Sequence, residues 1–212
     1  MRRLYLASDR VDGLPRFLGR DPRRCRLAFV PTASNVVDDG QETLAVDRER
    51  LLAMGFRLEP VELEALDRDE LEERLTGVDV LFVSGGNAFY LLHHAIRSGL
   101  TTLVPPLVRS GRLTYVGVSA GAVLAGPDLL PGASESTRWK APPLPSTRAM
   151  GLVPFRVLPH FDQPGRAERL GRLLTDPSIP FELVPLTDEE AVEVRGTRWR
   201  RVSAASSTTS AS

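Results

Sequence analysis

The amino-acid sequence predicts an α/β fold, a three-layer sandwich in which helices cover both faces of a mostly parallel central sheet. Short apolar runs alternate along the chain with longer stretches of helical character, which is the pattern of successive βαβ units. The 212 residues are enough for one substantial core. Parallel strands joined in this way end along one edge of the sheet, so we expect the ligand to bind there.

Seven apolar runs are predicted to form the parallel strands, and a hairpin follows them. The runs cover residues 4–7, 27–31, 56–63, 78–83, 113–118, 155–158 and 181–186. Helices are predicted at 42–54, 67–75, 88–98, 103–110, 120–125 and 166–174. Residues 191–194 and 199–202 flank Arg195-Gly196-Thr197, which predicts a hairpin near the end of the chain.

Composition favours one domain over residues 1–203, with a disordered tail at 204–212. The tail contains only Ser, Thr and Ala, which offer little to bury. Residues 127–150 interrupt the alternation and are rich in Pro, Ser and Gly. A loop of this length within a compact domain is commonly functional, so we expect it to cover a substrate.

The charge balance restricts the partners that the protein can attract. The 27 basic residues match 27 acidic ones, so no global field draws the chain to nucleic acid or to an anionic membrane. Cys25 is the single cysteine, which excludes an internal disulfide and a cysteine-based zinc site. The charge balance therefore favours a small, neutral partner. Because no apolar run is long enough for a signal peptide or a membrane span, we expect a cytoplasmic protein.

Residues 117–121 read Gly-Val-Ser-Ala-Gly and form the most informative motif of the chain. A predicted strand ends at Val118 and a helix-tolerant segment begins at Ala120, so Ser119 falls on a sharp turn between them. The flanking glycines lack a Cβ, which permits a strained turn and a close approach of helix and strand. Ser119 is therefore a candidate nucleophile. The alternative is a small-residue turn with a buried serine.

A nucleophilic serine needs a base, and the chain has three histidines. His93 and His94 are adjacent in a predicted helix, point to different faces, and lack the i, i+4 spacing of helical zinc ligands. His160 follows the strand predicted at 155–158, which we expect in the same sheet as Ser119. We therefore favour His160 as the general base.

A base in turn needs a carboxylate that fixes its tautomer and stabilises its cation. Asp188 and Glu189 stand together after the last predicted parallel strand, and position alone does not choose between them. Asp162 and Glu135 are less favoured substitutes.

Acyl transfer also needs hydrogen-bond donors for the developing oxyanion. The amide of Ala120 follows the nucleophile directly and is one candidate. The turn at 84–87 contains Gly85 and Gly86 after a predicted strand, and it exposes further amides. A nucleotide site at this turn is disfavoured, because the segment lacks both Gly-x-Gly-x-x-Gly and the lysine of a phosphate-binding loop.

Four segments, in this order and spacing, resemble the S51 serine peptidases. They are residues 84–92, 117–122, 159–162 and 186–188, and residues 31–34 are also similar to the family pattern. The family contains peptidase E, the α-aspartyl dipeptidase, and is related to cyanophycinase. The similarity extends from Arg3 to about Val194. It implies a sheet of the class I glutamine-amidotransferase-like kind.

The resemblance also implies roles for individual residues. Ser119 corresponds to the family nucleophile and His160 to its base. The alignment puts Asp188 at the position of the acid, although the family often has Glu there, and a shift of one residue would give this role to Glu189. Gly86 matches the glycine whose amide completes the oxyanion hole with that of Ala120.

Substrate recognition is implied for a further set of polar residues. Arg166 lies roughly where peptidase E has an arginine for the aspartyl side chain, and Arg169 is its competitor. Glu135, in the 127–150 loop, is a candidate for binding the free α-amino group. Asn87 is the remaining substrate-binding candidate.

We therefore expect a serine exopeptidase that cleaves short peptides, foremost dipeptides with N-terminal Asp, through an acyl-enzyme. Such an enzyme needs no metal and no organic cofactor. The alternatives are a cyanophycinase-like β-aspartyl peptidase, an aminopeptidase with another side-chain preference, and a non-catalytic member that binds a small ligand. Both a monomer and a homodimer fit the sequence.

Overall fold

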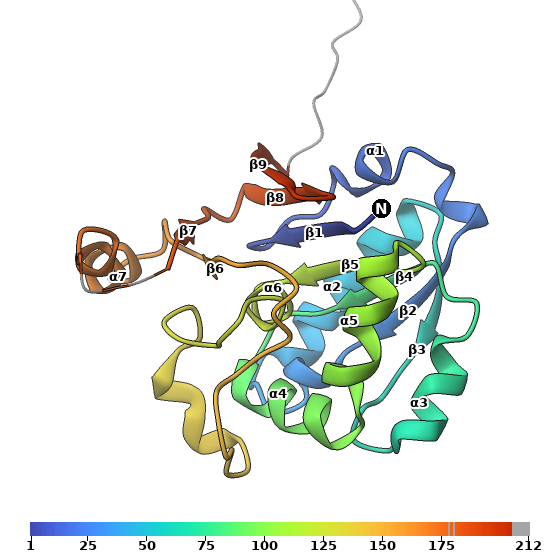
Figure 1. Cartoon of the computed structure of the whole chain (residues 1–212), viewed down its shortest axis with the longest axis horizontal. Coiled ribbons are helices and arrows are strands. Elements are labelled where there is room, and N and C mark those ends of the chain that lie inside the picture. Colours follow the sequence, from blue (N-terminus) through green and yellow to red (C-terminus); the bar gives the residue numbers. More distant parts are fainter. Residues whose placement is uncertain (178, 180, 205–212) are drawn as a thin grey trace, which may run out of the picture.

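The structure is a computed structural model that describes residues 1–177, 179 and 181–204. Its main sheet has seven strands in the order β3-β2-β4-β5-β1-β8-β9 (Figure 1). The parallel strands are β1 (Arg3–Ala7), β2 (Arg26–Val30), β3 (Arg57–Pro60), β4 (Val80–Val83) and β5 (Thr114–Val118). The predicted hairpin is β8 (Glu190–Arg195) and β9 (Arg198–Ser203), and β8 pairs antiparallel with β1.

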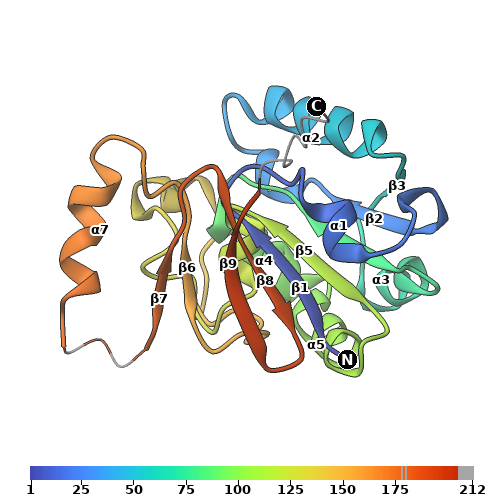
Figure 2. The ribbon, with the colours of Figure 1, turned by 90° about the horizontal axis from the view of Figure 1, so that it is seen from above.

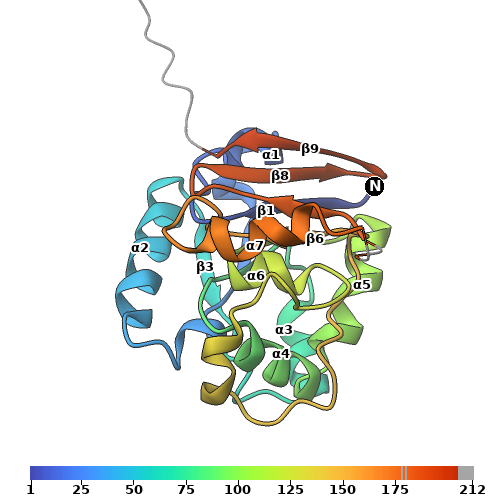
Figure 3. The ribbon, with the colours of Figure 1, turned by 90° about the vertical axis from the view of Figure 1, so that its left-hand side faces the viewer.

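Helices cover both faces of this sheet, as Figures 2 and 3 show, and the α/β class is confirmed. One face packs against α1 (Leu14–Leu18) and α2 (Gly40–Ala53). The other face packs against α3 (Arg68–Leu75), α4 (Ala88–Arg97), α5 (Leu100–Ser110) and α6 (Ala120–Leu124). β1 divides its side chains by the alternation of a strand: Leu4 and Leu6 join the second core, and Tyr5 and Ala7 the first.

The expectation that the strand before His160 belongs to the same sheet as Ser119 is wrong. β6 (Arg156–Leu158) pairs in parallel with β7 (Leu183–Pro185) in a separate two-stranded sheet. The physical reason is that both edges of β1 are already paired, one with β5 and the other with β8. In Figure 1 the small sheet lies beside the main one, with α7 (Arg166–Leu174) outside it.

Two smaller differences concern segments without a strong periodic pattern. α1 was not predicted, because its five residues are too few for a helical period to be recognised. The 127–150 loop contains the 3₁₀ helix η3 (Glu135–Lys140) and an isolated bridge between Asp128 and Arg148.

The structure describes the first residue of the tail predicted at 204–212. Ala204 is buried, and its N–H donates to the carbonyl oxygen of Glu189 at 2.7 Å. The rest of the predicted tail, 205–212, lies outside the described residues. No helix in the described part of the chain has the length and apolarity to cross a lipid bilayer.

Candidate active site

Ser119 lies on the turn between β5 and α6 with φ 47° and ψ −105°. A backbone in a sparsely populated region costs a residue other than glycine about 1–3 kcal/mol. The flanking glycines make the turn possible: a Cβ on Gly117 would lie 2.4 Å from the carbonyl oxygen of Gly121, and one on Gly121 would lie 2.2 Å from that of Val83. The N–H of Ser119 donates to the carbonyl oxygen of Ala7 at 2.9 Å, which ties the turn to β1.

The structure brings Ser119, His160 and Asp188 together. Ser119 Oγ lies 2.8 Å from His160 Nε2, and His160 Nδ1 lies 2.5 Å from Asp188 Oδ1. The three side chains come from the turn after β5 and from the segments that follow β6 and β7. Apart from glycines, only Ser119 and His160 have a positive φ among the described residues, and the φ of His160 is 58°.

A buried serine that the sequence did not single out holds this cluster in place. Ser8 follows β1 directly; its Oγ accepts the N–H of His160 at 2.7 Å and donates to Asp188 Oδ1 at 3.0 Å. Gln163 Nε2 donates to Asp188 Oδ2 at 3.1 Å, and Asp162 Oδ1 accepts the N–H of Asp188 at the same distance. The one signal in the sequence is that Ser8 is a polar residue at the end of a parallel strand.

The electrostatics keep Asp188 ionised. Burial alone would raise its pKa, but the hydrogen bond and charge of His160, together with the hydrogen bonds from Gln163 and Ser8, lower the pKa of Asp188 below its ordinary value. A carboxylate at Nδ1 selects the tautomer in which Nε2 can accept a proton from Ser119. Glu189, the alternative acid, is exposed and reaches Arg10 at 3.5 Å instead.

Gly86 and Ala120, the two candidates for the oxyanion hole, line the same cavity as Ser119. Gly86 has φ 130°, and a Cβ there would lie 2.2 Å from the carbonyl oxygen of Ala33. Only glycine fits this position without a clash. Ala120 is the first residue of α6, so its N–H has no acceptor within the helix. The pair can donate to an oxygen anion that forms beside Ser119.

The cavity that Ser119 lines has a volume of about 560 Å³. This size is within the usual range of small-ligand sites. It is bordered by the ends of β1, β4, β5 and β6, by α2 and by α7. The cavity therefore lies at the carboxyl ends of the parallel strands, where the sequence predicts the ligand site.

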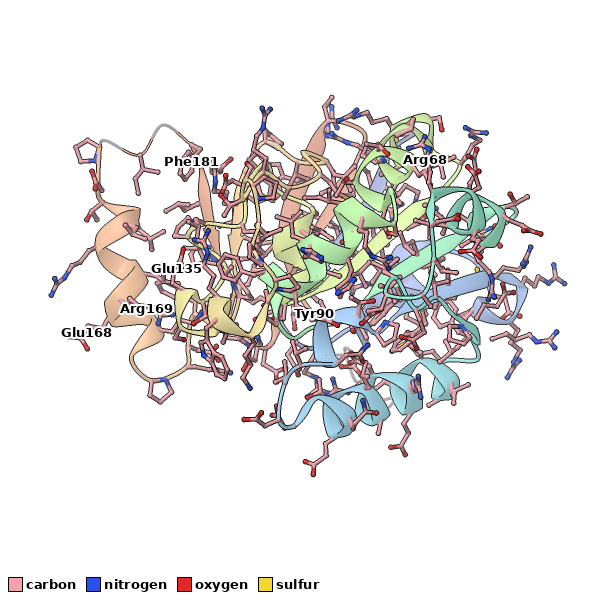
Figure 4. All side chains as sticks on the ribbon, turned by 90° about the horizontal axis from the view of Figure 1, so that it is seen from below. Arg68, Tyr90, Glu135, Glu168, Arg169 and Phe181 are labelled. Atoms are coloured by element: carbon pink, nitrogen blue, oxygen red, sulfur yellow. The ribbon has the colours of Figure 1, made fainter. Side chains whose placement is uncertain are left out.

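Arg166 lines this cavity, and its guanidinium is partly engaged. Its Nε donates to the carbonyl oxygen of Pro159 and its Nη2 to that of Gly132, both at 2.6 Å. Burial, with a smaller effect of the positive charge on Arg169, lowers the pKa of Arg166. Arg169 itself is exposed on α7, where Figure 4 labels it, and does not border the cavity.

The other two substrate-binding candidates lie differently from expectation. Glu135, labelled on η3 in Figure 4, pairs with Arg138 at 3.4 Å and does not border the Ser119 cavity. Asn87 is buried; its Oδ1 accepts two amides of the first turn of α4, as an N-cap does. Its Nδ2 donates to the carbonyl oxygen of Thr137 at 2.8 Å and so anchors the 127–150 loop.

No group of three or more His, Cys, Asp or Glu side chains in the described residues is arranged to hold a metal ion. His93 and His94 lie side by side on α4, with ring centroids 5.0 Å apart, and neither borders the cavity of Ser119. These two histidines therefore have no contact with the candidate site.

The fold and this cluster define an α/β protein that carries a serine, a histidine and an aspartate at the carboxyl edge of a parallel sheet. Residues 9–202 match the model of Peptidase family S51. The chain belongs to this family and is a peptidase, which confirms the resemblance found in the four sequence segments.

Individual relatives agree with the family. Peptidase E of Streptomyces coelicolor is 33% identical over 186 residues, which cover 84% of this chain and 71% of that protein. A Drosophila melanogaster protein named "Probable alpha-aspartyl dipeptidase" is 28% identical over 179 residues, covering 80% and 69%. The crystal structure of a Listeria monocytogenes protein assigned as a peptidase E has a TM-score of 0.82 at 27% identity, and covers 96% of this chain and 98% of its own.

Proposed function

We propose that this peptidase is a serine exopeptidase that cleaves short peptides through an acyl-enzyme on Ser119. The observation that carries the proposal is the continuous series of contacts from Ser119 Oγ through the His160 imidazole to the Asp188 carboxylate. The strained backbone of Ser119 supports it further, because strain of this kind is found where a nucleophile must project from a turn.

In the acylation step, Ser119 Oγ attacks the carbonyl carbon of the scissile bond while His160 Nε2 takes the serine proton. Asp188 stabilises the imidazolium, and the amides of Gly86 and Ala120 donate to the oxyanion. His160 then protonates the leaving amine as the carbon–nitrogen bond breaks. In deacylation, His160 removes a proton from water, which attacks the ester carbonyl and releases the acid and free Ser119.

For the substrate, we propose dipeptides with N-terminal Asp as the first class to test. Arg166 is a cation in the cavity and could bind the aspartyl carboxylate with the guanidinium hydrogens that its two carbonyl partners leave free. An aminopeptidase with another side-chain preference is the second class. The same two hydrogen bonds favour this class, because an Arg166 that holds the carbonyl groups of Pro159 and Gly132 has a structural role without binding a substrate carboxylate.

The test compares Ser119→Ala with the wild type on a panel of Asp-Xaa and Xaa-Leu peptides. We expect Ser119→Ala to lose hydrolysis of every peptide and labelling by a fluorophosphonate probe. Ser110→Ala, which removes an exposed hydroxyl at the end of α5, is the matched control. Unchanged turnover in Ser119→Ala would refute the assignment. Arg166→Ala then separates the substrate classes, because only an aspartyl enzyme should lose its preference for Asp-Xaa.

A further inference from the structure

Helix α2 carries a carboxylate at a position where a core helix has an apolar residue. Its buried residues are Gly40, Leu44, Asp47 and Leu51, spaced as the inward stripe of an amphipathic helix. The side chain of Asp47 is 3% exposed. Aspartate is almost never buried to this extent unless it is paired.

Asp47 is poorly paired. Its Oδ1 lies 4.0 Å from Arg50 Nη1, and the same nitrogen is closer to Asp9 Oδ2, at 3.6 Å. Its Oδ2 is buried and has no hydrogen-bond partner in the part of the chain that the structure describes. Burial, opposed by the charge of Arg50 and assisted by that of Asp9, raises the pKa of Asp47 to about 7. A buried carboxylate of this kind is costly and needs a reason.

Asp47 belongs to the wall of the Ser119 cavity. Asp47 borders this cavity together with Asp9, which follows β1, and Asp39, which precedes α2 and makes no capping hydrogen bond with its side chain. Arg166 borders it from α7, and Figure 2 shows α2 and α7 on different sides of the molecule. The cavity therefore has an acidic wall on the α2 side and a basic group on the α7 side.

We propose that Asp47, with Asp9 and Asp39, forms an anionic subsite that binds a cationic amino group of the substrate. Asp47 Oδ2 has no hydrogen-bond partner among the described residues, so rotation of the side chain toward the cavity would let it accept a charge-assisted hydrogen bond from an ammonium group there. The amino group has two possible sources, the N-terminus of a peptide or a lysine side chain. The inference deepens the proposed function, since it rests on Ser119 being the reactive group of this cavity.

Binding is measured in a Ser119→Ala background, so that the result does not depend on turnover. Isothermal titration calorimetry compares Asp-Leu and Leu-Leu with their N-acetyl forms and with N-acetyl-Lys-Leu. We expect an amine-bearing peptide to bind at least tenfold more tightly than its amine-free counterpart, and Asp47→Asn to remove that preference. Loss for the free dipeptides identifies the α-ammonium group, and loss for N-acetyl-Lys-Leu identifies the lysine side chain.

The matched control is Glu49→Gln, which removes an exposed carboxylate from the same helix and should leave every Kd unchanged. Equal binding of the amine-bearing and acetylated peptides, no binding of any of them, or an unchanged preference in Asp47→Asn would overturn the inference. Circular dichroism of Asp47→Asn checks that the variant is folded, and Asp47→Ser repeats the test with a smaller side chain.

Failure of the proposed function gives a different result. If Ser119 is not a nucleophile, the Ser119-intact protein is not labelled by the fluorophosphonate probe, while the calorimetric preference for an amine still reports on Asp47. In an active enzyme, Asp47→Asn should raise KM for the amine-bearing substrate at least tenfold. Its labelling by the uncharged probe should change less than twofold.

Discussion

Replacing Asp47 by asparagine is expected to stabilise the fold at alkaline pH, although it removes a charged group from the cavity. The pKa of this carboxyl is raised from 3.8 to about 7 in the folded protein by burial, an effect that Asp9 increases and Arg50 reduces. Because the pKa of Asp47 is higher in the folded than in the unfolded protein, the neutral carboxyl stabilises the fold fully at a pH below about 4. This stabilisation is lost as the pH rises through about 7.

The size of the effect follows from these two pKa values. At 1.36 kcal/mol per pKa unit, complete ionisation costs the folded state about 4 kcal/mol, of which about 3 kcal/mol develops between pH 5 and pH 8. Asparagine has the same shape and does not titrate. The free energy of unfolding of Asp47→Asn, relative to that of the wild type, should therefore rise by about 3 kcal/mol between pH 5 and pH 8.

The assay is urea-induced unfolding of both proteins, followed by circular dichroism at pH 5 and pH 8. Comparing the two proteins at each pH cancels the other titrating groups and any constant effect of the new amide. Glu49→Gln, with its exposed side chain, should give the same difference at both pH values. A difference between Asp47→Asn and the wild type that changes by less than about 0.5 kcal/mol would refute the idea that burial of a charge at Asp47 destabilises the fold.

Three further predictions concern the residues around Ser119. Ser8→Ala should lower kcat about tenfold with little change in KM, because Asp188 loses a hydrogen bond; an unchanged kcat contradicts this. Asp188→Asn should lower kcat about 10³- to 10⁴-fold, whereas Glu189→Gln should stay within twofold; the reverse order would make Glu189 the acid. Gly86→Ala should lower Tm, because its Cβ would lie 2.2 Å from the Ala33 carbonyl oxygen; an unchanged melting curve argues against that clash.

Much of the fold could be predicted because local sequence determines it. The apolar runs locate the parallel strands, and the glycines on either side of Ser119 specify the turn between β5 and α6. Having only three histidines in the chain made His160 easy to select as the partner of Ser119. The strands and the turn depend on residues within a few positions of one another, whereas the choice of His160 depends on the small number of histidines in the whole chain.

The features that could not be predicted depend on contacts between distant segments. β6 looks like any other short apolar strand, and nothing near it indicates that β8 already occupies the free edge of β1. Ser8 lies 152 residues from His160, and polar residues at strand ends are too common to single it out. Asp47 did carry a local signal, since it falls in the apolar stripe of a helix that the sequence predicts.

Ser119 and Asp47 border one cavity, and both reduce the stability of the fold. Ser119 has a backbone conformation that folding disfavours, and Asp47 has a charge in a place that folding disfavours. Neither is explained by stability, because a glycine in the turn or an apolar residue on α2 would cost less. Residues that reduce stability persist where they serve binding or chemistry. The coincidence of two such residues in one cavity is therefore a stronger argument for a substrate site than either residue alone.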